Sequence, residues 1–169
     1  MKITTQIEYG LRCILYIARC NREKPVSVSE MARNEDLPSD YVEQLLLKLR
    51  KGGLINSRRG LLGGYTLART ADKISVKDVV QALEEPIFEV VCSKVKDGKV
   101  RCNHMDECSV RPIWVRLYDA VNNVLQQATL EMLLQDEAGV HHAMSGPAPS
   151  SSLIPIPLIS KSSSAARGA

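Results

Sequence analysis

The chain has 169 residues, enough for one domain of ordinary size, and 44% of them are apolar. With one Trp and one Phe, its core must consist mainly of aliphatic side chains. No signal peptide is recognisable, and no apolar run approaches the roughly 20 residues that span a bilayer, so we expect a cytoplasmic protein without a membrane partner. The five cysteines are odd in number and unevenly spaced, which argues against a disulfide framework.

The net charge of +3 is distributed unevenly along the chain. Residues 1–73 contain 13 Lys and Arg against 8 Asp and Glu, whereas residues 74–169 contain 9 against 11. The basic excess therefore lies in the N-terminal part. It is a modest electrostatic footprint for nucleic acid, which many helical surfaces share.

Two capping patterns begin the first predicted helices. Thr5 and Glu8 form a capping box, and apolar residues follow at helical spacing until Pro25 prevents continuation. Ser27 and Glu30 form a second box, which opens a short helix through residue 33. The start of the chain is therefore predicted to be helical.

A turn at residues 35–38 precedes a third helix, which Ser39 is expected to cap and which runs over residues 40–51. Gly52 and Gly53 end it. Two helices joined by a short turn are typical of a helix-turn-helix, whose second helix enters the major groove of DNA. Its outward polar side chains predict contacts with base edges and phosphates by Ser39, Tyr41, Glu43, Gln44, Lys48 and Arg50.

Two short strands are predicted over residues 54–57 and 65–67. The loop between them is rich in glycine and carries Arg58 and Arg59, which suit a minor groove or the phosphate backbone. Such a wing beside a helix-turn-helix strengthens the prediction of DNA binding. Ser75 and Asp78 then cap a fourth helix that ends near residue 83.

Cys92, Cys102 and Cys108 lie within seventeen residues, in a polar segment that contains glycine. Thiolates clustered in such a segment usually bind a soft metal or an iron–sulfur cluster. Zinc sites favour tight pairs such as C-x₂-C, whereas the gaps here are nine and five residues. An iron–sulfur cluster is therefore the favoured ligand, with zinc and a metal-free thiol switch as alternatives.

Three cysteines leave such a cluster one protein ligand short. His104, between the second and third cysteines, is one candidate for the fourth ligand. Cys13 and Cys20, one heptad apart on the first helix, are interpreted as core residues.

An apolar stripe continues from Val110 to Met132, which predicts one helix roughly 35 Å long. This length exceeds what one small domain needs, which favours a dimerisation helix over the alternative, a long core helix. Residues 138–169 contain eight serines, four prolines and no acidic residue, which is typical of a disordered tail. We therefore predict a winged helix-turn-helix domain over residues 1–83, a cysteine-rich segment over 84–111, a dimerisation helix over 112–136 and a tail over 137–169. The fold class is mainly α with a small β-wing.

Residues 1–136 resemble the Rrf-two family of bacterial winged-helix regulators, including its IscR, NsrR and RirA types. The resemblance rests on YVEQL at 41–45, LRKGGLI at 49–55 and, most specifically, the wing SRRGLLGGYTLA at 57–68. It implies a homodimeric transcription regulator without enzymatic activity, which binds a double-stranded operator. It also implies recognition through Ser39, Tyr41, Glu43, Gln44 and Arg59, and a cluster held by Cys92, Cys102 and Cys108.

The chain departs from part of the family at the fourth ligand. Some members have a histidine three residues after the third cysteine, where this chain has Arg111. Others use a carboxylate near the N-terminus of the second protomer, which corresponds here to Glu8 of the partner subunit. The missing histidine favours a 4Fe–4S over a 2Fe–2S cluster.

Other classes of protein fit the sequence less well. No nucleophile elbow, phosphate-binding loop or metal-hydrolase motif is present, which argues against an enzyme. An electron-transfer module would need the cysteines but not the basic wing. The signal sensed, whether iron, cluster, redox or nitric oxide status or a small ligand, is left open.

Overall fold

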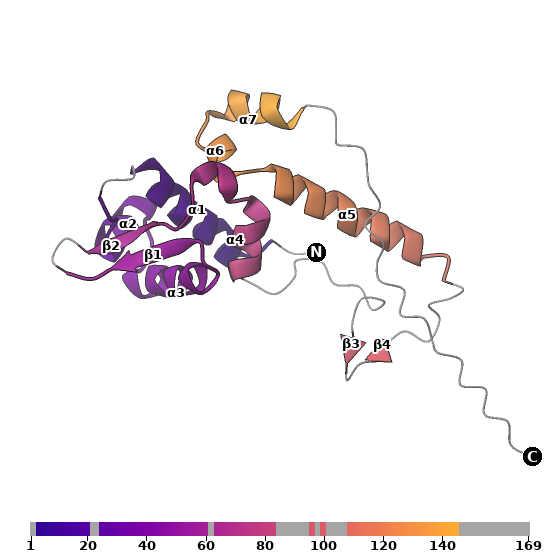
Figure 1. The fold of residues 1–169 in the computed structure, drawn as a ribbon, viewed down its shortest axis with the longest axis horizontal. Helices are drawn as coiled ribbons and strands as arrows, with labels where there is room; N and C mark the ends of the chain where they lie inside the picture. The colour runs from indigo at the N-terminus through magenta and orange to yellow at the C-terminus, as the bar shows by residue number, and fades with distance from the viewer. Residues whose placement is uncertain are drawn as a thin grey trace, which may run out of the picture.

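The computed structural model describes residues 3–20, 24–60, 63–83, 95–96, 99–100 and 108–145. Its elements, in chain order, are α1 (Thr5–Arg19), α2 (Val28–Glu35), α3 (Ser39–Lys51), β1 (Ile55–Arg58), β2 (Gly64–Leu67), the 3₁₀ helix η1 (Ala71–Lys73), α4 (Val76–Leu83), β3 (Val95–Lys96), β4 (Lys99–Val100), α5 (Arg111–Gln127), α6 (Leu130–Leu133) and α7 (Glu137–Met144). Figure 1 shows α1–α4 and the β1–β2 hairpin gathered in one body, from which α5 projects. The predicted fold class, mainly α with a small wing, is confirmed.

The starts of the helices follow local hydrogen bonds, and two of them differ from prediction by one residue. Ser27 accepts a hydrogen bond from the Glu30 N–H, as predicted for α2. The predicted cap at Thr5 is wrong: the extended residue before α1 is Thr4, whose side chain accepts from the Ile7 N–H, so Glu8 does not complete a capping box.

The predicted cap at Ser39 is also wrong. Pro38 is the N-cap of α3, and its carbonyl accepts hydrogen bonds from the Tyr41 and Val42 N–H groups. Proline suits this position because its φ of −60° is fixed and its missing N–H is not needed there. Ser39 is therefore already part of the helix.

The start of α4 is a complete capping box, as predicted. The Ser75 N–H donates to the Asp78 carboxylate at 3.0 Å, and the Asp78 N–H donates to the Ser75 Oγ at 3.1 Å. This reciprocal pair satisfies two backbone donors that the helix itself leaves free.

The main core is aliphatic and lies where α1, α2, α3 and α4 meet. α3 contributes three leucines that are almost fully buried, Leu45, Leu46 and Leu49. Leu130 of α6 is also fully buried in this cluster, although it comes from beyond the predicted winged-helix boundary at residue 83. The body is therefore completed by a short helix that follows α5.

α5 is shorter than predicted. It ends at Gln127, because Ala128 adopts an extended conformation and Thr129 caps α6 by accepting from the Met132 N–H. The Ala128 carbonyl accepts from the Val76 N–H at 2.7 Å, and the Leu130 N–H donates to the Ile74 carbonyl at 2.9 Å. These tertiary bonds fasten the chain to the start of α4 and interrupt the helix expected to reach residue 136.

The C-terminal prediction is wrong in part. Residues 137–144, predicted to begin a disordered tail, form α7, with Asp136 as N-cap accepting from the Gly139 N–H. Met144 packs against a small cluster around Ile7, Val76 and Val80. The rest of the predicted tail, from residue 146 onward, lies outside the described residues.

Among the parts of the chain that the structure describes, no helix is both long and apolar enough to cross a membrane.

Candidate nucleic-acid interface and metal centre

α2 and α3 are joined by a tight turn at residues 36–38. Asp36 adopts the left-handed conformation, with φ 54° and ψ 50°, and the Leu37 N–H donates to the Ala32 carbonyl at 2.9 Å. Leu37 packs against the main core. The turn orients α3 so that one side of the helix is buried and the opposite side faces solvent.

Four of the predicted DNA-binding residues on α3 are exposed: Ser39, Glu43, Gln44 and Arg50. They offer a hydroxyl, a carboxylate, a carboxamide and a guanidinium, which are groups that bond base edges and phosphates. Nothing in the α1–α4 body covers this side of the helix. The arrangement therefore leaves the predicted recognition surface open.

Tyr41 lies differently, on the side of α3 that faces α1. It is half-buried, and its ring meets Tyr9 edge-on, with centroids 6.1 Å apart and an interplanar angle of 89°. The Arg12 guanidinium lies 5.6 Å from the Tyr9 ring centre and also pairs with Glu35 at 2.7 Å. Sequence reasoning missed Tyr9 and Arg12, although their i, i+3 spacing on α1 was a readable signal.

Lys48 is also half-buried on the α1 side of α3. Its ammonium donates to the Gln6 Oε1 at 2.9 Å and to the Leu83 carbonyl at 3.0 Å. Gln6 Nε2 donates to the same carbonyl. The ammonium predicted to contact phosphate is thus engaged in bonds inside the protein, and sequence reasoning did not identify Gln6 as its partner.

The wing is an antiparallel hairpin of β1 and β2, in which Ser57 is opposite Tyr65 and Arg58 is opposite Gly64. Arg58 and Arg59 are exposed at its basic end. The hairpin is held from both sides. Arg50 of α3 donates to the Ser57 Oγ at 3.1 Å, and Tyr65 exchanges two backbone hydrogen bonds with Val26.

The predicted metal ligands are largely beyond the described parts of the chain. Cys92, Cys102 and His104 lie outside the described residues, whereas Cys108 is half-buried three residues before α5 and Glu8 is exposed on α1. Within the described residues no three His, Cys, Asp or Glu side chains cluster as a metal site would require. The ligand set remains a prediction.

The two cysteines of α1 are placed as core residues. Cys13 is fully buried, and burial raises the pKa of its thiol to about 12, so it stays protonated at neutral pH. Cys20 packs against the same core, and a hydrogen bond with it raises the pKa of the Tyr16 hydroxyl, which also donates to the Glu30 carboxylate at 3.1 Å. Both thiols are committed to packing or hydrogen bonding within the first body.

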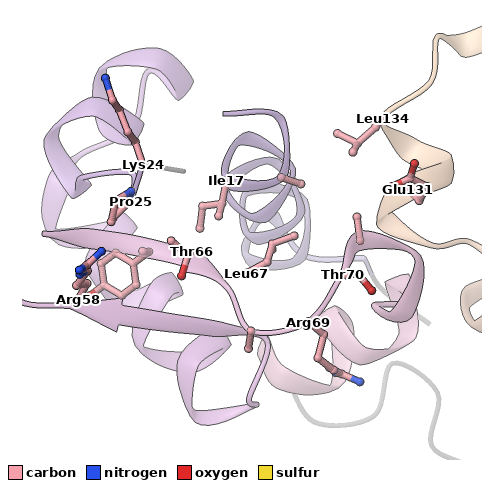
Figure 2. A pocket seen from close by; sticks show the side chains of 14 residues that line it. Ile17, Lys24, Pro25, Arg58, Thr66, Leu67, Arg69, Thr70, Glu131 and Leu134 are labelled. Atoms are coloured by element: carbon pink, nitrogen blue, oxygen red, sulfur yellow. The ribbon is translucent and has the colours of Figure 1, made fainter. Parts of the chain in front are cut away.

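A cavity of about 600 Å³ lies between α1, β2 and α6. Figure 2 shows Ile17 of α1, Leu67 of β2 and Leu134, the residue after α6, around the cavity, while the charged ends of Lys24 and Arg69 point away from it. Arg58 is the one predicted site residue in its lining. The cavity is therefore lined by both apolar and charged side chains.

Comparisons with known proteins agree with this geometry. Residues 3–136 match the family model Rrf2, described as an iron-dependent transcriptional regulator. Protein rrf2 of Nitratidesulfovibrio vulgaris is 40% identical over 136 residues, which cover 80% of this chain and 89% of that protein.

Two solved structures share the fold. The structure of CymR, the global cysteine regulator of B. subtilis, has a TM-score of 0.66 and 36% identity, and the match covers 80% of this chain and 99% of that one. IscR of T. potens has a TM-score of 0.61 and 30% identity, covering 79% and 86%. The α1–α4 body, wing and following helices are thus similar to those of known regulators.

Proposed function

Because the chain belongs to the Rrf2 family of transcriptional regulators, we propose that it is a homodimer whose operator binding is controlled by an iron–sulfur cluster held by Cys92, Cys102 and Cys108. The observation that carries the DNA-binding part is the exposed polar side of α3 beside a wing with two exposed arginines. It is no enzyme, since its relatives are transcription regulators.

DNA reading would divide between the two surfaces. Ser39, Glu43 and Gln44, near the start of α3, suit base edges in the major groove, because Gln pairs with adenine and Glu accepts from the cytosine amino group. Arg58 and Arg59 would insert into the adjacent minor groove or grip phosphates. Arg50 would contact phosphate, and it links the two surfaces through its bond to Ser57.

Dimerisation would use α5. None of its residues is buried, and it exposes Ile113, Leu117 and Val124 by 63%, 42% and 52%. These residues lie four, seven and eleven positions apart, so they share one side of the helix. A second copy of α5 would cover them and hold two recognition helices at a fixed spacing, as a two-fold operator requires.

The cluster would be of the 4Fe–4S type rather than 2Fe–2S, with Glu8 of the partner subunit as the fourth ligand and His104 as the competing candidate. The exposure of Glu8 on α1 supports its availability. The family's description as iron-dependent supports iron chemistry. A carboxylate ligand would exchange readily, which suits a sensor that must lose its cluster.

A cluster-free regulator is the second candidate. One relative is described as the global cysteine regulator, and another CymR structure as an oxidized form, so a sulfur-linked signal is also represented among similar proteins. In that case the three cysteines would act as a thiol switch or hold zinc.

Anaerobic purification followed by absorbance and Mössbauer spectroscopy tests the proposal. The wild type should show iron–sulfur charge-transfer bands, Cys102→Ala should lose them, and Glu8→Ala should shift the spectrum. Cys20→Ala is the matched control, because this thiol packs within the first body and should leave the spectrum unchanged. A colourless wild type that binds operator DNA and contains zinc or no metal would instead establish the cluster-free regulator.

A further inference from the structure

Three helices meet at the last residue of α4. The Leu83 carbonyl accepts hydrogen bonds from Lys48 on α3 and from Gln6 on α1, while Lys48 and Gln6 are bonded to each other at 2.9 Å. A cation at the carboxyl end of a helix is favoured, because the last carbonyls carry partial negative charge. The three groups form a closed hydrogen-bonded triangle around that carbonyl.

Packing at the same junction leaves little space for α4 to move relative to α1 and α3. A Cβ at Gly10 of α1 would lie 2.2 Å from a Leu83 methyl group, and a Cβ at Gly52 would lie 2.5 Å from the Ala82 Cβ. The end of α4 therefore touches α1 and the end of α3 directly. A displacement of Leu83 would have to move one of these helices.

Lys48 also belongs to a line of contacts along one flank of α3. Tyr41 and Lys48 are seven residues apart, which is about two helical turns. Tyr41 meets Tyr9 and Lys48 meets Gln6, so two residues of α1 hold the beginning and the later part of the recognition helix. Ser39, Glu43 and Arg50 lie on the opposite flank of α3, whereas Gln44, three positions after Tyr41 and four before Lys48, is exposed on the same flank.

We infer that Lys48 is a positioning residue: it fixes the recognition helix against Gln6 and the Leu83 carbonyl and does not contact phosphate. This inference rests on the proposed function for the identity of α3 as the recognition helix. Leu83 is followed in sequence by the cysteine-bearing segment, so the same bonds couple a movement at the end of α4 to the orientation of α3. A movement of Leu83 that changes these bonds would therefore change the affinity of the protein for its operator.

Salt dependence of DNA binding separates positioning from phosphate contact. The probe is a duplex selected by the wild-type protein from a random-sequence pool, titrated between low and moderate salt. Lys48→Met should weaken binding by roughly 2- to 30-fold, the range found at coupling positions, with the salt slope unchanged. Arg50→Met, at an exposed position of the same helix, should lower the slope by about one. A slope reduced by about one in Lys48→Met would overturn the inference.

Two further variants distinguish a loss of positioning from a general loss of folding. Lys48→Arg keeps a donor at this position and should recover most of the affinity, whereas Gln6→Leu should weaken binding with an unchanged slope. The double variant Gln6→Leu, Lys48→Met should be less weakened than the two single effects combined, because both act on one set of bonds. Independent, additive effects would contradict the shared junction.

Hydrogen exchange tests the positioning without DNA or cluster. In Lys48→Met, amide exchange should accelerate at the end of α4 and in the second half of α3, while α2 keeps its wild-type rates. In the Arg50→Met control, which loses the bond to Ser57 but keeps the junction, exchange at the end of α4 should stay at the wild-type rate. Wild-type rates throughout Lys48→Met would overturn the inference. Absence of DNA binding by the wild type would refute the proposed function alone, since the exchange comparison would still decide the role of Lys48.

Discussion

The α1–α4 body and α5 are both built from amphipathic helices, yet they use their apolar residues in opposite ways. In the body, α3 buries Val42, Leu45, Leu46 and Leu49 against neighbouring helices. α5 is the longest helix of the described chain and buries none of its residues. Together with Leu130 of α6 the body has a closed core, whereas α5 presents an apolar stripe that a further surface would complete.

This contrast fits the different tasks that we propose for the two regions. A body with a closed core holds α3 and the wing in one geometry, which reading a DNA sequence requires. An exposed helix outside that core is free to meet a second copy and set the distance between two such bodies. Substitutions that change one region and leave the other intact test this contrast.

The largest effect on stability is expected from Leu46→Ala in the body. Leu46 is fully buried, so its truncation should lower the free energy of unfolding by roughly 2–5 kcal/mol, measured by chemical denaturation. Leu47→Ala is the matched control one position further along α3. Leu47 is 43% exposed, and its truncation should cost less than about 1 kcal/mol. Equal costs would show that the burial pattern of α3 is misassigned.

The next effect is expected from Leu117→Glu on α5. A charge on the exposed apolar stripe should weaken the proposed dimer by about 30-fold or more, because a central interface residue is typically worth 2 kcal/mol or more. Sedimentation equilibrium measures this, and the unfolding free energy of the body should change little. Gln126→Glu adds the same charge on the opposite side of α5 and should leave association unchanged. A monomeric wild type would contradict dimerisation through α5.

A smaller effect is expected from Ser75→Ala. The substitution removes the hydroxyl that accepts from the Asp78 N–H, so the free energy of unfolding should fall by about 1 kcal/mol. Because the backbone next to this cap also bonds the chain after α5, hydrogen exchange should accelerate at Val76 and Leu130 as well as within α4. Exchange confined to α4 would show that the two regions are not joined at this point.

Sequence reasoning was most successful where the deciding contacts are local. The helix-turn-helix order, the hairpin and the Ser75–Asp78 capping box depend on residues a few positions apart, and all three are confirmed. The first helix illustrates the limit of the method. Thr4 and Thr5 both fit a cap, and the conformation of one residue decides between them.

Contacts between distant segments were not predictable from one sequence. The break at Ala128 depends on a hydrogen bond to Val76, and the inward position of Lys48 depends on Gln6 and Leu83. Periodicity shows neither contact, because the stripe itself continues through residue 132. For the site, six of the eight predicted DNA-binding residues are exposed, while Tyr41 and Lys48 are half-buried on the α1 side, and contact with DNA stays a prediction.

The paired bonds between residues 74–76 and 128–130 have a consequence for how such a protein can diversify. They bring the start of α4 and the exit of α5 to one place, so the chain between Leu83, at the end of α4, and Ala128 begins and ends at the same body. Lengthening this interval destabilises the fold only slightly, since each doubling of a loop's length costs only about 0.6 kcal/mol of closure entropy. The interval between Leu83 and Ala128 can thus change in length and sequence while α3, α4 and the wing keep their geometry.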